Sequence, residues 1–267
     1  MGKLFTALGL MSGTSGDGID ASIITSDGFD QYSEITNRYF KYDQKIYENL
    51  HNLKGKILMY EDLQKNKSEI KNLERELTLF HAHAVTKTLR IFDEKIDFIG
   101  FHGQTIYHNS IEKISKQIGD GNLLSQLTKK DVIFNFRQND IDNGGEGAPL
   151  APIFHRLLTH KNNINLPACI LNIGGIANLT AITDYDKDNF LSRDLGPGNC
   201  LIDEWLRKNS KEKFDENGKI ANRGKINDLI LNQALDNFDN RINQNSFSFD
   251  IKDFSLGFVR GLNLEDG

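Results

Sequence analysis

Residues 9–20 read Gly-Leu-Met-Ser-Gly-Thr-Ser-Gly-Asp-Gly-Ile-Asp; they follow an apolar run at residues 4–10 and lead into a second one at residues 19–25. Two apolar runs joined by a glycine-rich segment predict a strand, a turn and a second strand. Glycine lets the backbone approach a ligand closely and adopt positive φ. Successive exposed N–H groups in such a turn form a concavity for anions. The segment therefore predicts a phosphate-binding hairpin.

The polar side chains of this hairpin suit a nucleotide polyphosphate with magnesium. The hydroxyls of Ser12, Thr14 and Ser15 add hydrogen-bond donors. Asp17 and Asp20 can hold a hydrated magnesium ion, which binds through one or two carboxylates plus phosphate; we take Asp17 as the ligand. No lysine follows the last glycine, which excludes a Walker-type loop. For this segment alone, an ordinary glycine-rich turn is the alternative.

A second segment of the same kind occupies residues 169–183, Cys-Ile-Leu-Asn-Ile-Gly-Gly-Ile-Ala-Asn-Leu-Thr-Ala-Ile-Thr. Gly174 and Gly175 between apolar runs predict a hairpin. We expect this turn, together with Asn178, to contact the nucleotide as well. The repeat suggests two related domains that face each other across a cleft, residues 1–130 with the phosphate hairpin and residues 131–267, since domain interfaces favour ligand sites.

The bulk properties exclude several classes of protein. The chain has 267 residues and a net charge of −5, which argues against a nucleic-acid-binding surface. The sequence contains no run of 18 apolar residues, so it predicts no transmembrane helix. We therefore expect a cytoplasmic protein without membrane or nucleic-acid partners. Cys169 lies in a predicted buried strand, where a reduced core thiol is expected rather than a disulfide.

Strands and helices alternate along the chain, which predicts an α/β protein. Apolar residues recur at helical spacing at Ile70, Leu73, Leu77, Phe80 and Ala84, so this stripe is expected in the core. The expected strands are residues 4–10, 17–26, 34–42, 96–101 and 132–136. The expected helices lie in residues 43–92, 149–160 and 201–208. Residues 208–245 are read as loops and short helices.

Polar residues cluster where the predicted strands end, which is where ligands bind in open α/β sheets. Asp140 is our candidate for the general base, because an aspartate near a hydroxyl or water commonly has this role in phosphoryl transfer. Arg137 is placed to orient a group or to neutralise charge. The predicted substrate-binding residues, all in glycine-rich or polar turns, are His102, Gln104, Thr105, Arg137, Gly196, Gly198 and Asn199.

Seven motifs occur in an order that resembles the anhydro-N-acetylmuramic acid kinase family. The resemblance covers residues 5–205 well and residues 206–267 loosely. Besides residues 9–20, the motifs are His-Gly-Gln-Thr at 102–105, Gln-Ile-Gly-Asp at 117–120, Phe-Arg-x-x-Asp at 136–140, Gly-Gly-x-Gly-Ala-Pro-Leu-x-Pro at 144–152, Leu-Asn-Ile-Gly-Gly-Ile-Ala-Asn at 171–178 and Gly-Pro-Gly-Asn at 196–199.

The resemblance implies an actin/hexokinase-like (ribonuclease H-like) two-domain fold with ATP and Mg²⁺ in the cleft. It implies a kinase that opens 1,6-anhydro-N-acetylmuramic acid with water and phosphorylates O6, giving N-acetylmuramic acid 6-phosphate in peptidoglycan recycling. The family's general base falls on Asp140. The family's ATP loop falls on Gly13, Thr14, Ser15, Gly16, Asp17, Gly18, Ile19 and Asp20.

The family's members are longer than this chain, so the second domain is expected to be incomplete and to expose apolar surface. A homodimer mate or a partner chain is then expected to supply the C-terminal part. Four motif positions also differ from the family, at Gly16, Asn135, Glu146 and Leu195. The alternatives are an inactive remnant or one half of a split kinase that acts only by binding. A further alternative is an acetate-kinase-like or hexokinase-like enzyme with another substrate.

Overall fold

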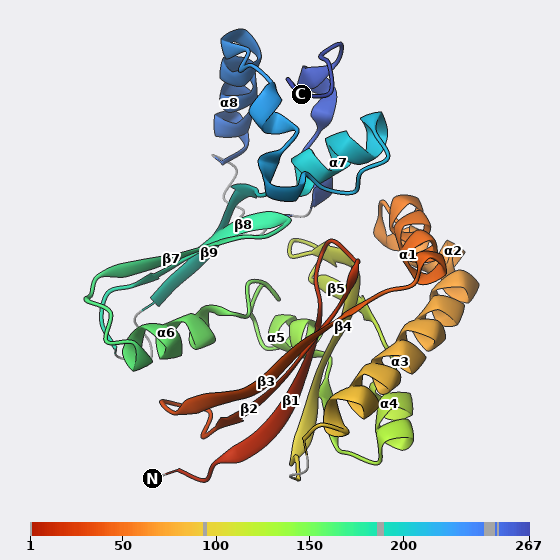
Figure 1. Ribbon diagram of the computed structural model, residues 1–267, viewed down its shortest axis with the longest axis vertical. Coiled ribbons are helices and arrows are strands. Elements are labelled where there is room, and N and C mark those ends of the chain that lie inside the picture. The colour runs from red at the N-terminus through yellow and green to blue at the C-terminus, as the bar shows by residue number, and fades with distance from the viewer. Residues whose placement is uncertain (1, 93–94, 186–189, 243–248, 250) are drawn as a thin grey trace. The chain divides into compact units, whose positions relative to one another are not determined.

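The computed structural model describes residues 2–92, 95–185, 190–242, 249 and 251–267. The chain divides into two compact units (Figure 1). Unit 1 comprises Met1–Ala168 and Thr183–Asp188, and unit 2 comprises Cys169–Ile182 and Asn189–Gly267. The sequence placed a boundary near residue 130 instead. Residues 132–134 form a strand of the unit 1 sheet, so this region lies with unit 1 by its contacts.

Unit 1 is built on a mixed sheet with the strand order of the ribonuclease H-like fold. β1 (Phe5–Ser12), β2 (Gly18–Ser26) and β3 (Tyr32–Lys41) form an antiparallel meander. β4 (Phe98–Asn109) runs parallel to β1, and β6 (Val132–Phe134) runs parallel to the first part of β4. The expected α/β class and actin/hexokinase-like architecture are thereby confirmed for this unit.

The strand expected at residues 96–101 is longer than the sequence indicated. β4 continues to Asn109 because its second part pairs antiparallel with β5 (Ile114–Ile118), a strand that the sequence analysis missed. His102, Gln104 and Thr105 therefore lie within β4 and not in a loop after it. A positive φ of 71° at Gly103 marks the point where the strand changes partners.

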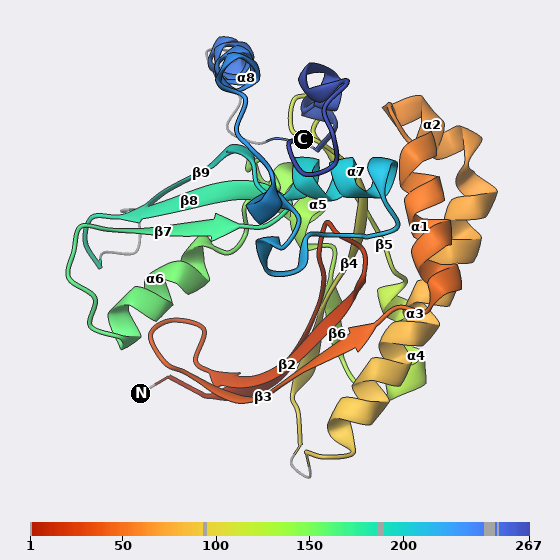
Figure 2. The same cartoon turned by 45° about the horizontal axis from the view of Figure 1, so that its top comes forward.

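Four helices cover one face of the unit 1 sheet; α1, α3 and α4 lie on the same side of it in both ribbon views (Figures 1 and 2). They are α1 (Gln44–Lys56), α2 (Tyr60–Lys65), α3 (Lys67–Leu89) and α4 (Gly121–Thr128). The stripe from Ile70 to Ala84 lies in or against the core, as expected. The α3 residue His81 is fully buried against the ring of Phe101, and burial lowers the pKa of its imidazole to about 4.

The opposite face of the sheet carries α5 (Phe136–Asp142). Phe101 faces α3, so its neighbour Gly100 faces the other way, and a Cβ on Gly100 would meet the Phe136 ring at 3.9 Å. The sequence analysis expected a strand through residue 136, which is wrong. Asn135 adopts a positive φ of 65° and α5 begins directly after it, so Arg137 and Asp140 are helical. α6 (Pro152–Lys161) follows in the same unit.

Unit 2 repeats the start of unit 1, with a three-stranded sheet followed by a helix. β7 (Ala168–Ile173) and β8 (Ile176–Ile182) are joined by the two-residue turn that the sequence predicts. β9 (Phe190–Pro197) was not predicted, so Asp194 and Gly196 lie in a strand and not in a turn. α7 (Cys200–Asn209) follows, and later α8 (Asp228–Ile242). Short 3₁₀ turns span Glu216–Gly218, Ala221–Arg223, Ile251–Asp253 and Leu256–Val259.

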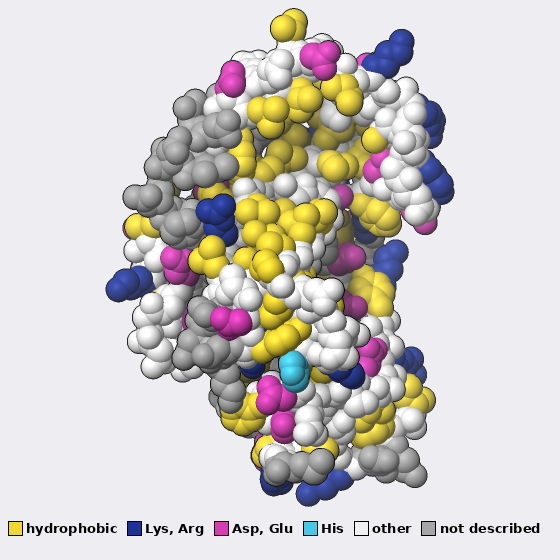
Figure 3. Space-filling view, turned by 90° about the vertical axis from the view of Figure 1, so that its left-hand side faces the viewer, with side chains coloured by type: hydrophobic (Ala, Val, Ile, Leu, Met, Phe, Trp, Pro, Cys, Tyr) yellow, Lys and Arg dark blue, Asp and Glu magenta, His cyan; other side chains and the backbone are white. Residues whose placement is uncertain are grey.

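Unit 2 leaves many apolar side chains exposed, as the sequence analysis expected. Leu171 and Ile173 on β7 are 52% and 64% exposed. Hydrophobic side chains also gather on the face of the molecule drawn in Figure 3. Cys169 is exposed, which corrects the prediction of a buried core thiol; Cys200 is the buried cysteine. Within the described residues, no helix has the length and apolar character needed to cross a bilayer.

Candidate active site

The buried hydroxyl group of Ser12, at the end of β1, holds the glycine-rich hairpin in place. Ser12 Oγ lies 2.6 Å from Gln104 Oε1, 2.9 Å from the Tyr42 hydroxyl and 3.0 Å from the Gly18 carbonyl oxygen. Since a hydroxyl carries one proton and accepts two bonds, Ser12 donates to the nearest acceptor, Gln104, and accepts from Tyr42. One residue at the end of β1 thus connects both sides of the hairpin to β4.

Gln104 completes this anchor from β4. Its side chain is fully buried, and Nε2 donates to the carbonyl oxygens of Gly13 at 3.0 Å and Thr105 at 3.3 Å. Ser12 and Gln104 are paired across β1 and β4 after a register shift, which explains why the two side chains meet. The sequence predicted that Gln104 contacts substrate. In the structure, the side chain of Gln104 instead bonds to the hairpin: its amide oxygen accepts from Ser12 and its amide nitrogen donates to Gly13, both within unit 1.

The tip of the hairpin is shaped by Gly16, whose φ is 61°. Its N–H donates to the Gly13 carbonyl oxygen at 3.1 Å, and a Cβ at this position would lie 2.7 Å from Leu50 Cδ2 on α1. Glycine is therefore required by both backbone and space. From the same helix, Lys54 Nζ donates to the Thr14 carbonyl oxygen at 2.7 Å. The tip thus lies directly against α1.

Two carboxylates stand where the hairpin enters β2. Burial first, and then the charge of Asp17, raises the pKa of Asp20. The ring of Tyr39 lies over Gly18, where a Cβ would come within 2.6 Å of it. Burial and a hydrogen bond to Asp17 raise the pKa of the Tyr39 hydroxyl. Two neighbouring carboxylates that repel each other can be stabilised by a divalent cation that also binds phosphate oxygens. Among the described residues, no three acidic, cysteine or histidine side chains form a metal site by themselves.

A second group of residues centres on the neutral imidazole of His102. Its Nε2 accepts a hydrogen bond of 2.8 Å from Arg137 Nε, so its proton is on Nδ1, which lies 2.7 Å from the Gly103 carbonyl oxygen. Burial and the charge of Arg137 lower the pKa of His102 to about 4. The imidazole is therefore uncharged near neutral pH and holds the arginine by accepting from it.

Asp140 is fixed by the glycine-rich loop that follows α5. Its Oδ2 accepts a hydrogen bond of 2.8 Å from the Gly147 N–H, while Arg137 donates to the Gly147 carbonyl oxygen at 2.7 Å. A Cβ on Gly145 would lie 2.1 Å from the same carboxylate oxygen, so no other residue fits there without displacing it. The carboxylate and the guanidinium are thus positioned by one loop, and Asp140 remains half-buried.

Polar side chains on the β4–β5 hairpin form a third group in unit 1. Gln117 Nε2 donates to Thr105 Oγ1 at 3.2 Å and to Ser115 Oγ at 2.8 Å. Ser115 Oγ also lies 3.0 Å from His108 Nδ1. Gln117 Oε1 is buried without a hydrogen-bond partner in the described part of the chain. Thr105, a predicted substrate residue, therefore belongs to a polar network on β4 and β5.

In unit 2, the predicted glycine residues are packed backbone to backbone. The N–H groups of Gly198 and Asn199 donate to the carbonyl oxygens of Gly175 and Gly174 at 3.0 and 2.8 Å. A Cβ on Gly198 would lie 2.1 Å from the Gly174 carbonyl oxygen. The close approach requires glycine at residue 198, and it joins the β7–β8 turn to the start of α7.

The remaining unit 2 residues lie along β8 and β9. Asn178 pairs with Asp194, whose Oδ2 accepts from the Phe249 N–H at 2.9 Å. Gly196 has a φ of 154°, and a Cβ there would lie 2.4 Å from the Phe238 ring. The predicted site residues of unit 2 thus form one local group around the β7–β8 turn and β9.

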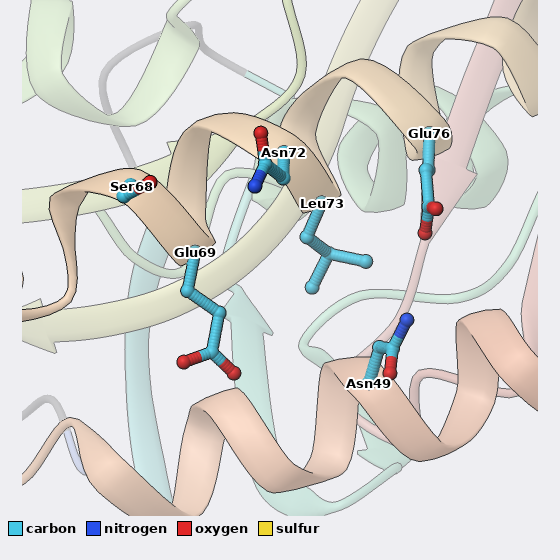
Figure 4. A pocket seen from close by; sticks show the side chains of 6 residues that line it. All are labelled: Asn49, Ser68, Glu69, Asn72, Leu73 and Glu76. Atoms are coloured by element: carbon cyan, nitrogen blue, oxygen red, sulfur yellow. The ribbon is translucent and has the colours of Figure 1, made fainter.

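A cavity of about 410 Å³ lies between α1 and α3, away from these groups (Figure 4). Its wall consists mainly of polar and acidic side chains from the two helices. The lining residues are Asn49, Ser68, Glu69, Asn72, Leu73 and Glu76. None of them was predicted as a site residue.

Within unit 1, most of the predicted residues lie in the glycine-rich hairpin or in the His102–Arg137–Asp140 group. Gln104 instead holds the hairpin from β4, and Thr105 belongs to the polar network of β4 and β5. The side chain of Ile19 is fully buried in the core. Sequence reasoning missed Lys54, Tyr39 and Tyr42. The sequence gives no local sign of Lys54, since a lysine in an amphipathic helix is ordinary, and the two tyrosines become visible only once the β2–β3 register is known.

Unit 1 is an α/β unit of the ribonuclease H-like class, and the first turn of its sheet is an acidic, glycine-rich hairpin. Residues 5–242 match the family model for anhydro-N-acetylmuramic acid kinase. The chain belongs to this family, and the family's enzymes are phosphotransferases. The expected kinase function is therefore confirmed at the level of the family, and the non-catalytic alternative is not favoured.

Curated relatives carry the same family name. The anhydro-N-acetylmuramic acid kinase of Pelagibacter ubique (strain HTCC1062) is 59% identical over 267 residues, which is 100% of this chain and 71% of the relative. That of Agrobacterium fabrum is 39% identical over 231 residues, covering 85% of this chain and 61% of the relative. Among solved structures, the Aquifex aeolicus PPX-GPPA enzyme is a distant match, with a TM-score of 0.32 and 11% sequence identity. The match covers 79% of this chain and 57% of the Aquifex chain.

Proposed function

We propose that the chain uses ATP and Mg²⁺ to convert 1,6-anhydro-N-acetylmuramic acid into N-acetylmuramic acid 6-phosphate, in cytoplasmic peptidoglycan recycling. The family match supports this substrate. The observation that carries the chemistry is the fixed pair of Arg137 and Asp140, because one loop orients a carboxylate and a guanidinium together. A base and a cation held in this way suit a reaction that is mainly a problem of positioning.

The proposed reaction begins at the anomeric carbon. Asp140 accepts a proton from water as the water oxygen bonds to C1, and the bond between C1 and O6 breaks. The freed O6 attacks the γ-phosphorus of ATP, and ADP leaves. Overall, water, the anhydro sugar and ATP give the 6-phosphorylated sugar, ADP and a proton, which Asp140 returns to solvent. His102 keeps Arg137 in place by accepting its Nε–H.

The nucleotide is proposed to lie on the phosphate hairpin, with its phosphates against residues 13–18. Asp17, with Asp20 beside it, would hold Mg²⁺, which would supply positive charge to offset that of the transferred phosphoryl group. Gly174, Gly175 and Asn178 contact the nucleotide from unit 2. The sugar is bound by His102, Thr105, Arg137, Gly196, Gly198 and Asn199. For Gln104 we propose a different role, that of holding the hairpin, because its side chain is fully buried.

The test is an ADP-release assay with the anhydro sugar and MgATP, with the phosphorylated product identified by ³¹P NMR. Asp140→Asn should lower kcat by about 10²–10⁴-fold, the usual cost of losing a general base. Asp142→Asn is the matched control, because Asp142 lies two residues further on the same helix and is exposed. Equal turnover by D140N and the parent would reject Asp140 as the base. ATP binding without any phosphorylated sugar would favour a non-catalytic protein.

A further inference from the structure

We propose that Lys54 supplies the cation of the phosphate-binding hairpin and contacts the ATP phosphates. This inference rests on the proposed function and adds a nucleotide-binding residue from outside the hairpin motif. Lys54 lies on α1, and its ammonium nitrogen is 2.7 Å from the Thr14 carbonyl oxygen at the tip of the hairpin. No residue of segment 9–20 is a lysine or an arginine.

The position of the ammonium group follows from the packing of α1. The helix begins after Asp43, whose side chain accepts from the Ile46 N–H at 2.8 Å. One face of the helix is buried through Leu50, which lies against Gly16 of the hairpin. Lys54 follows Leu50 by one helical turn and therefore shares that face. The side chain of Lys54 is thus carried by a helix that packs into unit 1 through Ile46, Leu50 and Leu53.

The charge of the hairpin explains what a lysine would do there. The segment carries the carboxylates of Asp17 and Asp20, and a bound triphosphate adds several negative charges to them. Magnesium offsets part of this charge. In Walker-type loops, a lysine of the loop itself reaches the β- and γ-phosphates. Here the lysine comes from the neighbouring helix α1, and its ammonium group lies at the tip of the glycine-rich hairpin.

The other two lysines of α1, Lys45 and Lys56, bind to α3 and not to the hairpin. Lys45 is ion-paired with Glu76 at 2.8 Å, and Lys56 is ion-paired with Glu69 at 2.8 Å, both on α3. Lys54 instead donates to the backbone of the hairpin. Lys56 is therefore a matched control, because its removal takes the same charge from the same helix without changing the hairpin.

The test is calorimetric binding of MgATP and of inorganic tripolyphosphate to the 267-residue chain. Tripolyphosphate carries the charge of the nucleotide without its adenosine, so it isolates the phosphate contacts. Lys54→Met should weaken both ligands by about 10- to 100-fold, the range for a hydrogen bond to a charged group. Lys54→Arg should retain most of the affinity, and Lys56→Met should leave it unchanged. The salt dependence of binding should also decrease in K54M.

Two results would overturn the proposal. If K54M binds tripolyphosphate as tightly as the parent chain, Lys54 does not contact phosphate. If the parent chain itself does not bind tripolyphosphate, the hairpin is not a phosphate site and Lys54 has no such role. Circular dichroism of K54M shows whether the fold is intact, and if K54M does not fold, Lys54→Gln, which also removes the charge but keeps a polar side chain, gives the answer. The proposed kinase reaction is judged separately, by whether phosphorylated sugar forms.

Discussion

Replacing Gln104 by leucine should loosen the phosphate hairpin without disturbing the sheet around it. The substitution removes three side-chain hydrogen bonds: two to the hairpin, to Ser12 at 2.6 Å and to the Gly13 carbonyl oxygen at 3.0 Å, and a longer one to the Thr105 carbonyl oxygen at 3.3 Å. Both hairpin partners keep another bond, Ser12 to Tyr42 and Gly13 to the N–H of Gly16. The loss is then the net value of two short bonds, about 1 kcal/mol each, and of one longer and weaker bond, so the free energy of unfolding should fall by about 2–3 kcal/mol.

Urea denaturation measures this loss, with an unchanged slope if the unfolded state is unaffected. Hydrogen exchange locates it, because the peptide that spans residues 13–18 should exchange faster in the variant. Gln138→Leu is the control, since Gln138 bonds to Asp142 on α5, away from the hairpin. The anchoring role of Gln104 is refuted if Q104L and the parent chain show the same stability and the same exchange in the hairpin.

Three further outcomes are expected. Gly145→Ala should lower kcat with little change in the free energy of unfolding, because its Cβ would displace the Asp140 carboxylate; unchanged kinetics would show that the loop does not position the base. Asp17→Asn should lose activity that raised Mg²⁺ or Mn²⁺ partly restores, whereas no metal should restore the Asp140→Asn variant. Burial lowers the pKa of His81 from 6.5 to about 4, so its stabilising contribution is complete above pH 6.5 and is lost as the pH falls toward 4. Urea denaturation should therefore show roughly 2–3 kcal/mol less stability at pH 4.5 than at pH 7 from this residue, and His81→Phe should remove that difference; an equal pH dependence in both chains would contradict it.

Much of the fold follows from local patterns. The meander of β1, β2 and β3, the core stripe of α3 and the β7–β8 turn were all predicted, because alternation, helical spacing and paired glycines act over short distances. The misses have physical causes. β5 and β9 are polar strands that exist through pairing with β4 and β8. α5 is short, and its start depends on one positive φ, at Asn135.

Only part of the candidate site could be predicted from the sequence, for a similar reason. Residue types and their order pointed to the hairpin and to Arg137 and Asp140, because glycine, carboxylate and arginine have few uses in such turns. The role of Gln104 depends on a register shift between β1 and β4 that no local pattern encodes. Lys54 reaches the hairpin from about forty residues away, through the packing of a helix.

The single residue between His102 and Gln104 ties the two parts of the unit 1 site together. His102 holds the arginine beside the proposed base, Gln104 holds the hairpin, and Gly103 between them bends the strand where a Cβ would meet the Ile118 carbonyl oxygen at 2.7 Å. A strand resists stretching far more than a loop does. The distance between the proposed base and the proposed phosphate-binding hairpin is therefore fixed by β4, and a shift of this strand would move both together.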